Sequence, residues 1–259
     1  MPQRKEPKLP IMELFGPTIQ GEGIMTGTVT NFLRTGGCGL RCSWCDSLFA
    51  VLPKEIKAGR RMMTISEILK AVQALPEAPY LTLTGGDPCL HKALGDIIPV
   101  LNVAGVRIAV ETQGQLFPDW LERTDVITFS PKGPSSGNTV DTQDLYDWLG
   151  HRSPKRPFRV CIKIVVFSKR DFEYALTVYN SLPHVFYDTF YFTTGTPTHL
   201  LDGSDIGDKG LERIMGVIAL QQQLAMFMLN QKGTTKFNDK VHLGCQQHVL
   251  LWPDKDKGV

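Results

Sequence analysis

The sequence has no long hydrophobic run, no internal repeat and no low-complexity tract. A membrane-spanning helix needs about 20 consecutive apolar residues, and no stretch of the chain approaches that length, so no membrane association is predicted. The first residues, Met-Pro-Gln-Arg-Lys-Glu-Pro-Lys, are polar. Because a secretory leader is apolar, we expect a cytoplasmic protein.

Neither sign of charge dominates. The chain has 28 Lys and Arg against 26 Asp and Glu, a formal net charge of +2, with both signs mixed along its length. Nucleic-acid-binding proteins normally concentrate basic residues in one patch, so no nucleic-acid partner is predicted. A hydrophobic fraction of 42% over 259 residues is enough for a sizeable core. This composition favours an enzyme with a small-molecule substrate.

Cysteine is also scarce, and six residues in a cytoplasmic chain do not predict disulfides. Three of them, however, stand together as Cys38, Cys42 and Cys45. Thiolates suit zinc or iron–sulfur clusters. A structural zinc site usually has a fourth ligand, for which His91 or Cys89 is a candidate. Three cysteines in one short loop instead indicate a four-iron cluster with one iron open to chemistry.

Strand-like and helix-like segments alternate along the chain. Strands are expected at Val29–Arg34, Tyr80–Thr84, Val106–Val110, Asp125–Phe129, Arg159–Val166, Val185–Phe192 and Val249–Trp252. Helices are expected after a capping box at Thr64–Glu67, at Lys92–Ala104, from Ser168 to about Asn180, and at Lys209–Asn230. Leu48–Arg61 is interpreted as a local loop insertion and Pro131–Asn138 as a surface loop.

This alternation predicts an α/β fold with a parallel sheet and right-handed crossovers. About six strand–helix units are too few for a closed eight-fold barrel. We therefore expect a partial (β/α)6-type barrel in a single domain over residues 1–259.

Polar or glycine-rich segments directly follow several predicted strands. They are the loop Cys38–Cys45 (the cysteine loop), Thr84-Gly85-Gly86-Asp87-Pro88, Glu111-Thr112-Gln113-Gly114 and Ser130-Pro131-Lys132. Ligands of parallel α/β folds gather at the carboxyl ends of strands, so these segments predict one shared site. Taken singly, Gly85-Gly86 could be an ordinary turn, and Arg34 could form a structural ion pair as readily as bind a substrate carboxylate.

The Cys-x3-Cys-x2-Cys loop followed by a strand ending in Gly-Gly resembles the radical S-adenosylmethionine (SAM) superfamily. Within it, the chain is similar to the 7-carboxy-7-deazaguanine synthase family over nearly its whole length. The residues that carry this resemblance are Glu13–Gly23, Phe32–Arg34, Cys45–Ser47, Glu111–Gly114, Ser130–Lys132 and Gln246–Trp252.

The resemblance implies the partial barrel of radical SAM enzymes and a lyase reaction. The family contracts the ring of 6-carboxy-5,6,7,8-tetrahydropterin to 7-carboxy-7-deazaguanine and releases ammonia, a step toward queuosine and other deazapurines. The implied cofactors are a [4Fe-4S] cluster, SAM, which yields a 5′-deoxyadenosyl radical, and Mg2+. The implied partners are a reducing flavodoxin or ferredoxin and a second copy of the chain in a homodimer.

The resemblance also implies roles for particular residues. The cluster ligands would be Cys38, Cys42 and Cys45, and the magnesium ligand Ser47. SAM would be held by Gly86, Glu111, Ser130, Pro131, Lys132, Thr193, Thr194, Gly195 and Thr196. The pterin would be held by Ile19, Gln20, Gly21, Glu22, Arg34, Thr84, His248 and the terminal carboxylate of Val259, with residues 242–259 folding back to the site.

Some positions depart from the family pattern or remain outside it. Asp87 stands where Glu is frequent, and Thr193-Thr194 replaces a common Gln-Pro or Gln-Val pair. Cys89, Cys161 and Cys245 are interpreted as small buried hydrophobic residues. Two other functions stay open: a radical SAM activating enzyme that acts on a protein partner, and a non-enzymatic zinc-binding module.

Overall fold

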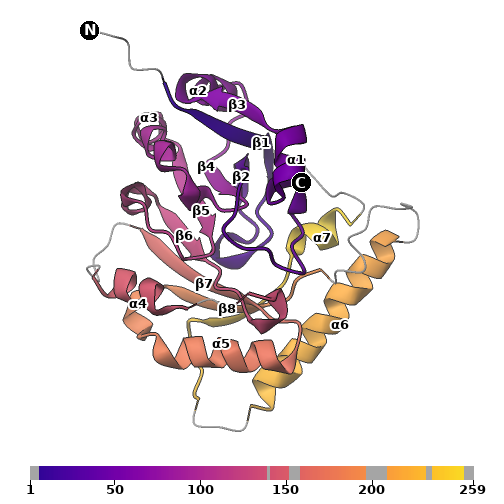
Figure 1. Ribbon diagram of the computed structural model, residues 1–259. Coiled ribbons are helices and arrows are strands. Elements are labelled where there is room, and N and C mark those ends of the chain that lie inside the picture. The colour runs from indigo at the N-terminus through magenta and orange to yellow at the C-terminus, as the bar shows by residue number, and fades with distance from the viewer. Residues whose placement is uncertain (1–5, 139–140, 152–157, 197–208, 232–234, 254–259) are drawn as a thin grey trace.

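The computed structural model describes residues 6–138, 141–151, 158–196, 209–231 and 235–253. Its strands form one sheet in the order β3-β1-β2-β4-β5-β6-β7-β8-β9 (Figure 1). The strands are β1 (Lys8–Ile19), β2 (Val29–Thr35), β3 (Arg61–Thr64), β4 (Tyr80–Gly85), β5 (Arg107–Thr112), β6 (Val126–Phe129), β7 (Arg159–Val165), β8 (Thr189–Thr193) and β9 (Val241–Gly244).

Seven of these strands, β2 and β4 to β9, pair in parallel, whereas β1 is antiparallel to both β2 and β3. The sheet does not close, because β3 and β9 are its two edges. The helices are α1 (Pro53–Gly59), α2 (Ile65–Gln73), α3 (Ile98–Val103), α4 (Gln143–Gly150), α5 (Lys169–Ser181), α6 (Lys209–Leu229) and α7 (Gln247–Leu251). Most of the helices lie around the outside of the curved sheet, but α7 lies toward its inner side (Figure 1). The predicted partial α/β barrel is confirmed.

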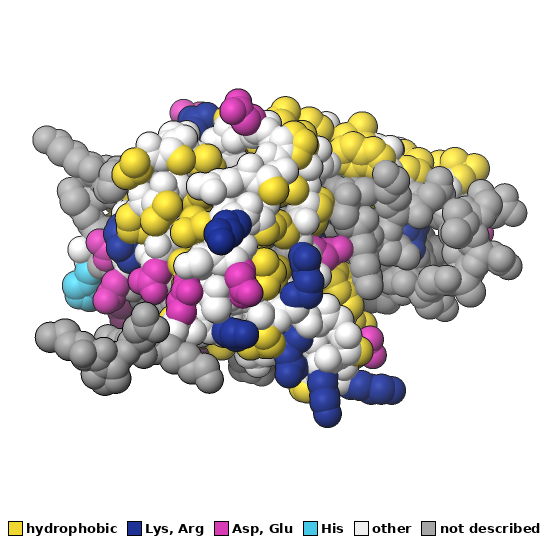
Figure 2. Space-filling model, turned by 90° about the horizontal axis from the view of Figure 1, so that it is seen from above, with side chains coloured by type: hydrophobic (Ala, Val, Ile, Leu, Met, Phe, Trp, Pro, Cys, Tyr) yellow, Lys and Arg dark blue, Asp and Glu magenta, His cyan; other side chains and the backbone are white. Residues whose placement is uncertain are grey.

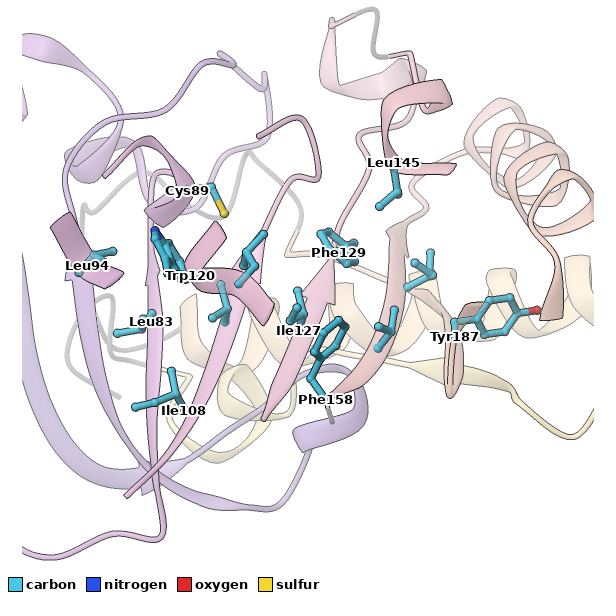
Figure 3. Close-up of a cluster of buried hydrophobic side chains, with 14 of the residues drawn as sticks. Leu83, Cys89, Leu94, Ile108, Trp120, Ile127, Phe129, Leu145, Phe158 and Tyr187 are labelled. Carbon is cyan, nitrogen blue, oxygen red and sulfur yellow. The ribbon is translucent and has the colours of Figure 1, made fainter. Parts of the chain in front are cut away.

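The two-residue period of each strand separates an apolar outer side from a more polar inner side. On β7, for example, Val160, Ile162 and Ile164 belong to the main core, while Lys163 points to the inner side. Residues of the main core include Leu83, Ile108, Ile127 and Phe129 from β4, β5 and β6 (Figure 3). Because the helices bury the outer side chains, the polar residues of the inner side are left facing a common space.

Two helices begin with the capping boxes that their sequences predict. Thr64 accepts from the Glu67 amide at the start of α2, and Ser168 does the same with Asp171 at the start of α5. The predicted helix over Lys92–Ala104 is split into a 3-10 turn at Lys92–Asp96 and α3. Among the helices that the structure describes, none combines the length and apolarity of a membrane span.

Several sequence predictions are wrong. Val249–Trp252 is not a strand, because α7 covers most of it, and the last strand is the earlier β9. Val185–Phe192 starts with a 3-10 turn, and β8 begins only at Thr189. The insertion Leu48–Arg61 contains α1 rather than loop alone. The long strand β1 was not predicted, since its Gly-Pro pair and mixed burial hide the alternation that marks a strand.

The distribution of surface charge agrees with the nearly equal numbers of acidic and basic residues in the sequence. Seen from above, acidic and basic side chains lie side by side on the same face (Figure 2).

Candidate active site

A cavity of about 450 Å³ lies on the inner side of the sheet, at the carboxyl ends of its parallel strands. All four predicted rim segments reach it. They contribute Cys38, Cys42 and Cys45, Thr84 with Gly85 and Gly86, Glu111 with Thr112 and Gln113, and Ser130 with Lys132. The predicted convergence on one site is therefore what the fold produces.

The three loop cysteines are free, half-buried and open to this cavity. Burial raises the pKa of all three thiols, and for Cys45 burial together with the adjacent Asp46 raises it to about 12. Three thiolates in such a place require positive charge to stabilise them. Soft sulfur donors and this unmet need for cations fit an iron–sulfur cluster. Within the described ranges, no three His, Cys, Asp or Glu side chains are arranged around a single metal ion, so a site for one ion such as zinc is the poorer fit.

The candidate fourth zinc ligands lie elsewhere. Cys89 is 4% exposed and belongs to the apolar core (Figure 3). The His91 ring bonds to the Gly36 carbonyl at 3.0 Å, and burial lowers its pKa. Neither residue lines the cavity with the three loop cysteines. His91 therefore supports the strand that leads into the loop. Cys161 is fully buried and Cys245 half-buried, so two of the three spare thiols are buried as predicted.

The loop after β6 packs directly on the cysteine loop. The Ser43 amide donates to the Ser136 carbonyl at 3.0 Å, and the Trp44 indole donates to Ser135 Oγ at 3.0 Å. The Asn138 amide side chain lies 3.5 Å from the Cys42 sulfur as a donor. Pro131, Gly133 and Ser136 are buried, whereas the other residues of Pro131–Asn138 are partly or fully exposed, so the predicted surface loop also packs on the cysteine loop.

The two glycines after β4 have a packing role. Gly85 has φ +143°, and a Cβ on either glycine would collide with the backbone of Thr35 or Gly37. The Gly86 amide donates to the Thr35 carbonyl at 3.1 Å, and the Asp87 amide donates to the Gly37 carbonyl at 2.7 Å. These two amides therefore bind the end of β2 and Gly37, which directly precedes the cysteine loop. Gly86 itself still lines the cavity.

Asp87 is buried beneath the cysteine loop. Its Oδ1 accepts from the Thr112 hydroxyl at 2.8 Å and from the Cys89 amide at 3.1 Å. Burial raises the pKa of this carboxyl despite these bonds. Its shorter side chain, in place of the frequent Glu, therefore ties the β4 and β5 ends together.

Arg34 does form the structural ion pair considered above. Its Nε donates to Glu13 Oε2 at 2.8 Å, and one terminal nitrogen lies 3.4 Å from Ser47 Oγ. The Ser47 hydroxyl in turn donates to Asp46 Oδ1 at 3.0 Å. Arg34, Asp46 and Ser47 all line the cavity. Ser47 thus has a carboxylate beside it, and both supply the hard oxygen donors that Mg2+ prefers.

A buried charge network occupies the side of the cavity formed by β5 and β7. Lys163 forms an ion pair with Glu22 and lies 3.9 Å from Glu111 Oε1. Glu111 also accepts from Gln20 Nε2 at 3.3 Å and from the Thr84 hydroxyl at 3.0 Å. Burial, the largest single effect, would raise the pKa of Glu22, but Lys163, His248 and Gln246 together outweigh it and hold that pKa at about 2. The same carboxylates raise the pKa of Lys163 against its burial.

The residues predicted to hold SAM divide into those that line the cavity and those that lie behind the lining. Among the lining residues, Lys132 donates from its Nζ to Ser130 Oγ at 2.9 Å, and this Nζ lies 5.7 Å from the centre of the Trp44 ring. Burial and the nearby Lys163 lower its pKa. Those that line the cavity are Gly86, Glu111, Ser130, Lys132, Gly195 and Thr196. Pro131, Thr193 and Thr194 are buried but are not part of the lining.

The segment after β9 closes one side of the cavity. The Gln247 amide donates to the Gly21 carbonyl at 2.9 Å, which places His248 against Gln20 and Gly21. Gln246 links the segment after β8 to the residue after Cys45. Its side chain accepts from the Thr196 hydroxyl at 2.7 Å and donates to Asp46 Oδ2 at 3.0 Å. The predicted fold-back of residues 242–259 can be followed to Pro253. Val259 lies outside the described residues.

All other residues predicted to hold the pterin line the cavity: Ile19, Gln20, Gly21, Glu22, Arg34, Thr84 and His248. Sequence reasoning missed Lys163, Gln246 and Arg213. Arg213, from α6, is 7% exposed and donates to the Pro253 carbonyl at 3.0 Å. Only Lys163 carried a signal, since a lysine inside the apolar run 160–166 must have a partner if that strand is buried.

Comparisons with known proteins agree with this geometry. Residues 32–127 match the model of the radical SAM superfamily. The chain is 35% identical to the 7-carboxy-7-deazaguanine synthase of Bacillus cereus, over 97% of this chain and 99% of that one. It is 34% identical to that of Bacillus subtilis, over 97% and 98% of the two chains. The crystal structure of QueE from Escherichia coli superposes with a TM-score of 0.60 at 22% identity, covering 93% of this chain and 95% of that one.

Proposed function

The chain belongs to the 7-carboxy-7-deazaguanine synthase family of the radical SAM superfamily, and we propose that its cavity converts 6-carboxy-5,6,7,8-tetrahydropterin to 7-carboxy-7-deazaguanine. The reaction contracts the pterin ring and releases ammonia, so the enzyme is a carbon–nitrogen lyase. The observation that carries the proposal is that one cavity combines three free cysteines with a separate network of Gln20, Glu22, Thr84 and Glu111.

Each side of the cavity has its own task in this proposal. Cys38, Cys42 and Cys45 hold the [4Fe-4S] cluster, which fits their soft donors. When bound, the cluster and SAM would supply radical chemistry at a substrate carbon. Of the lining residues predicted to hold SAM, Gly86, Ser130, Lys132, Gly195 and Thr196 keep that role in this proposal. Glu111 is assigned to the pterin instead, because it accepts from Gln20 and Thr84, which belong to the pterin side. The buried Pro131, Thr193 and Thr194 support these positions from behind.

The pterin lies on the opposite side. Arg34 binds its carboxylate with the part of the guanidinium that the Glu13 bond leaves available. Ser47 would ligate Mg2+, with Asp46 orienting the Ser47 hydroxyl, and the bound ion would supply positive charge to the oxygen atoms of the substrate. Ile19, Gln20, Gly21, Thr84 and His248 surround the ring.

An anaerobic product assay tests this function. The enzyme with reconstituted cluster, SAM, Mg2+ and a chemical reductant should form 7-carboxy-7-deazaguanine from the carboxytetrahydropterin. Cys42→Ala should lose both the visible absorption of the cluster and the product, whereas Cys89→Ala, a core substitution, should keep the absorption. SAM cleavage without deazaguanine would contradict the substrate and favour a protein partner. Bound zinc without iron uptake would favour the zinc module.

We also propose a single domain, because one continuous sheet joins all the described strands. A flavodoxin or ferredoxin would reduce the cluster.

The proposed homodimer is supported by an apolar stripe along one side of α6, where exposed apolar side chains recur at helical spacing. These are Leu211, Met215, Ile218, Met226 and Leu229. Sedimentation velocity measures the assembly directly, and a monomer at micromolar concentration would contradict the dimer.

A further inference from the structure

Lys163 is the one charged side chain on the strand β7 that faces into the cavity. The alternation along the strand places Val160, Ile162 and Ile164 in the core and Lys163 on the inner side. The residue is 7% exposed. A charge this deeply buried is unfavourable unless it is paired, so its position requires an explanation from the groups around it.

Those groups are two carboxylates that come from different parts of the chain. Glu22 follows β1 and forms an ion pair with Lys163, and Glu111 ends β5 with its Oε1 at 3.9 Å from Lys163 Nζ. Fixed donors hold Glu111 as well, since Gln20 and Thr84 both donate to it. An ionised carboxylate has about four acceptor positions. The carboxylates of Glu22 and Glu111 therefore each keep lone pairs that can accept hydrogen bonds from a ligand in the cavity.

Lys163 is needed for these carboxylates to act as acceptors. Without a nearby cation, a buried carboxyl group takes up a proton and then carries a donor O–H in place of an acceptor. The other cavity lysine, Lys132, is placed differently, because it contacts Ser130 and the Trp44 ring. The two lysines thus serve two different parts of the cavity.

The pterin that the proposed function assigns to this site has a matching edge. Its 2-amino group and the neighbouring N3–H are adjacent hydrogen-bond donors. We propose that Lys163 is a positioning residue that holds Glu22 and Glu111 as acceptors for this donor edge. The inference rests on the proposed function and extends it, because it assigns selection of the 2-amino group to a residue that does not touch the reacting carbon.

Equilibrium binding tests this role without turnover. Isothermal titration calorimetry of the oxidised, cluster-loaded enzyme with SAM and Mg2+ would compare two unreactive probes. Pterin-6-carboxylate keeps the donor edge, and lumazine-6-carboxylate has oxygen in place of the 2-amino group. Lys163→Met should weaken pterin-6-carboxylate binding by about 100-fold, as expected when one partner of a buried charge pair is truncated. It should also reduce the preference for the pterin over the lumazine.

Matched variants separate positioning from general damage. Lys163→Arg should restore binding to within about tenfold, because the charge is kept. Adding Glu22→Gln to Lys163→Met should cost little more than the single change, since residues that act through each other are not additive. Lys132→Met should weaken SAM binding more than pterin binding, the reverse of Lys163→Met. Lys163→Gln gives the same comparison if the Met variant does not fold.

Two outcomes would overturn the inference. One is that Lys163→Met binds both probes as the unchanged enzyme does. The other is that it loses SAM and pterin affinity in equal measure, which would indicate a purely structural role. Failure of the unchanged enzyme to bind pterin-6-carboxylate would instead remove the proposed substrate, and the inference with it.

Discussion

Glu22 shows how strongly neighbours change the chemistry of one side chain in this cavity. Burial disfavours its charged form, but the Lys163 ammonium, with a smaller contribution from His248, holds its pKa at about 2. Asp87 shows the opposite balance, since burial prevails there and raises its pKa. The two acids differ because Glu22 forms an ion pair with a buried lysine, whereas Asp87 accepts from the Thr112 hydroxyl and the Cys89 amide.

The Glu22 pKa predicts how stability depends on pH. The folded value lies below the ordinary value of 4.5, so the ion pair contributes stability above about pH 4.5 and loses it as the pH falls toward 2. Glu22→Gln should lower the free energy of unfolding by about 3 kcal/mol at pH 7, because a buried charge loses its partner. The difference from the unchanged protein should shrink below pH 4.5.

Urea unfolding of cluster-free protein at a series of pH values measures this difference. Glu77→Gln, at an exposed position, controls for the substitution itself. A gap between the Glu22 variant and the unchanged protein that stays constant from pH 7 to 3 would contradict the assignment.

At the scale of elements, the start of α5 is linked to the cysteine loop through one carboxylate. Asp171 completes the capping box with Ser168, and its Oδ1 accepts from the Ser135 amide at 2.8 Å. Ser135 in turn accepts from the Trp44 indole and bonds Ser43. A helix cap therefore also positions the loop that covers the cysteine loop.

The two capping boxes give a matched pair of variants. Asp171→Ala should lower stability by about 3 kcal/mol, since the partly buried amides of Ser135, Phe167 and Ser168 lose their acceptor. It should also lower iron uptake. Glu67→Ala removes the equivalent acid from α2, which caps only its own helix. It should cost less stability and leave iron uptake unchanged.

Iron content per chain after anaerobic reconstitution, with urea unfolding beside it, distinguishes the two variants. Equal iron uptake in both would show that α5 does not position the cysteine loop.

At the scale of the whole molecule, the cavity is complete only because two segments far apart in the sequence meet. The segment after β9 bonds to the segment after β1 through the Gln247 amide and the Gly21 carbonyl. At Gly21 a Cβ would lie 2.7 Å from the His248 backbone nitrogen and closer still to its ring. Glycine is required at this position because the backbones approach each other so closely.

Gly21→Ala should therefore displace His248 and open the pterin side of the cavity. We expect the KM for the pterin to rise by at least about tenfold, equivalent to 1.4 kcal/mol, while SAM cleavage continues. Gly150→Ala is the control, because its added Cβ would meet Phe186 only at ordinary contact distance. Steady-state kinetics with both substrates measures the effect, and an unchanged pterin KM would mean that the C-terminal segment does not close the site.

Periodic and local features could be predicted, and long-range contacts could not. The capping boxes at Thr64 and Ser168 and the parallel strands β4 to β7 follow from spacing within short windows. The docking of Ser135 and Asn138 on the cysteine loop could not be foreseen, because a polar loop bonds equally well to water. Lys163 was overlooked since its partner Glu22 is 141 residues away.

By itself, the sequence determined the α/β class, the cysteine loop and the order of the rim segments, because each depends on residues close together in the chain. Only the tertiary structure decided which side of each strand faces the cavity and which charges meet there. Burial makes that decision, since a helix that covers one side of the sheet leaves the other side to enclose Lys163 with Glu22 and Glu111.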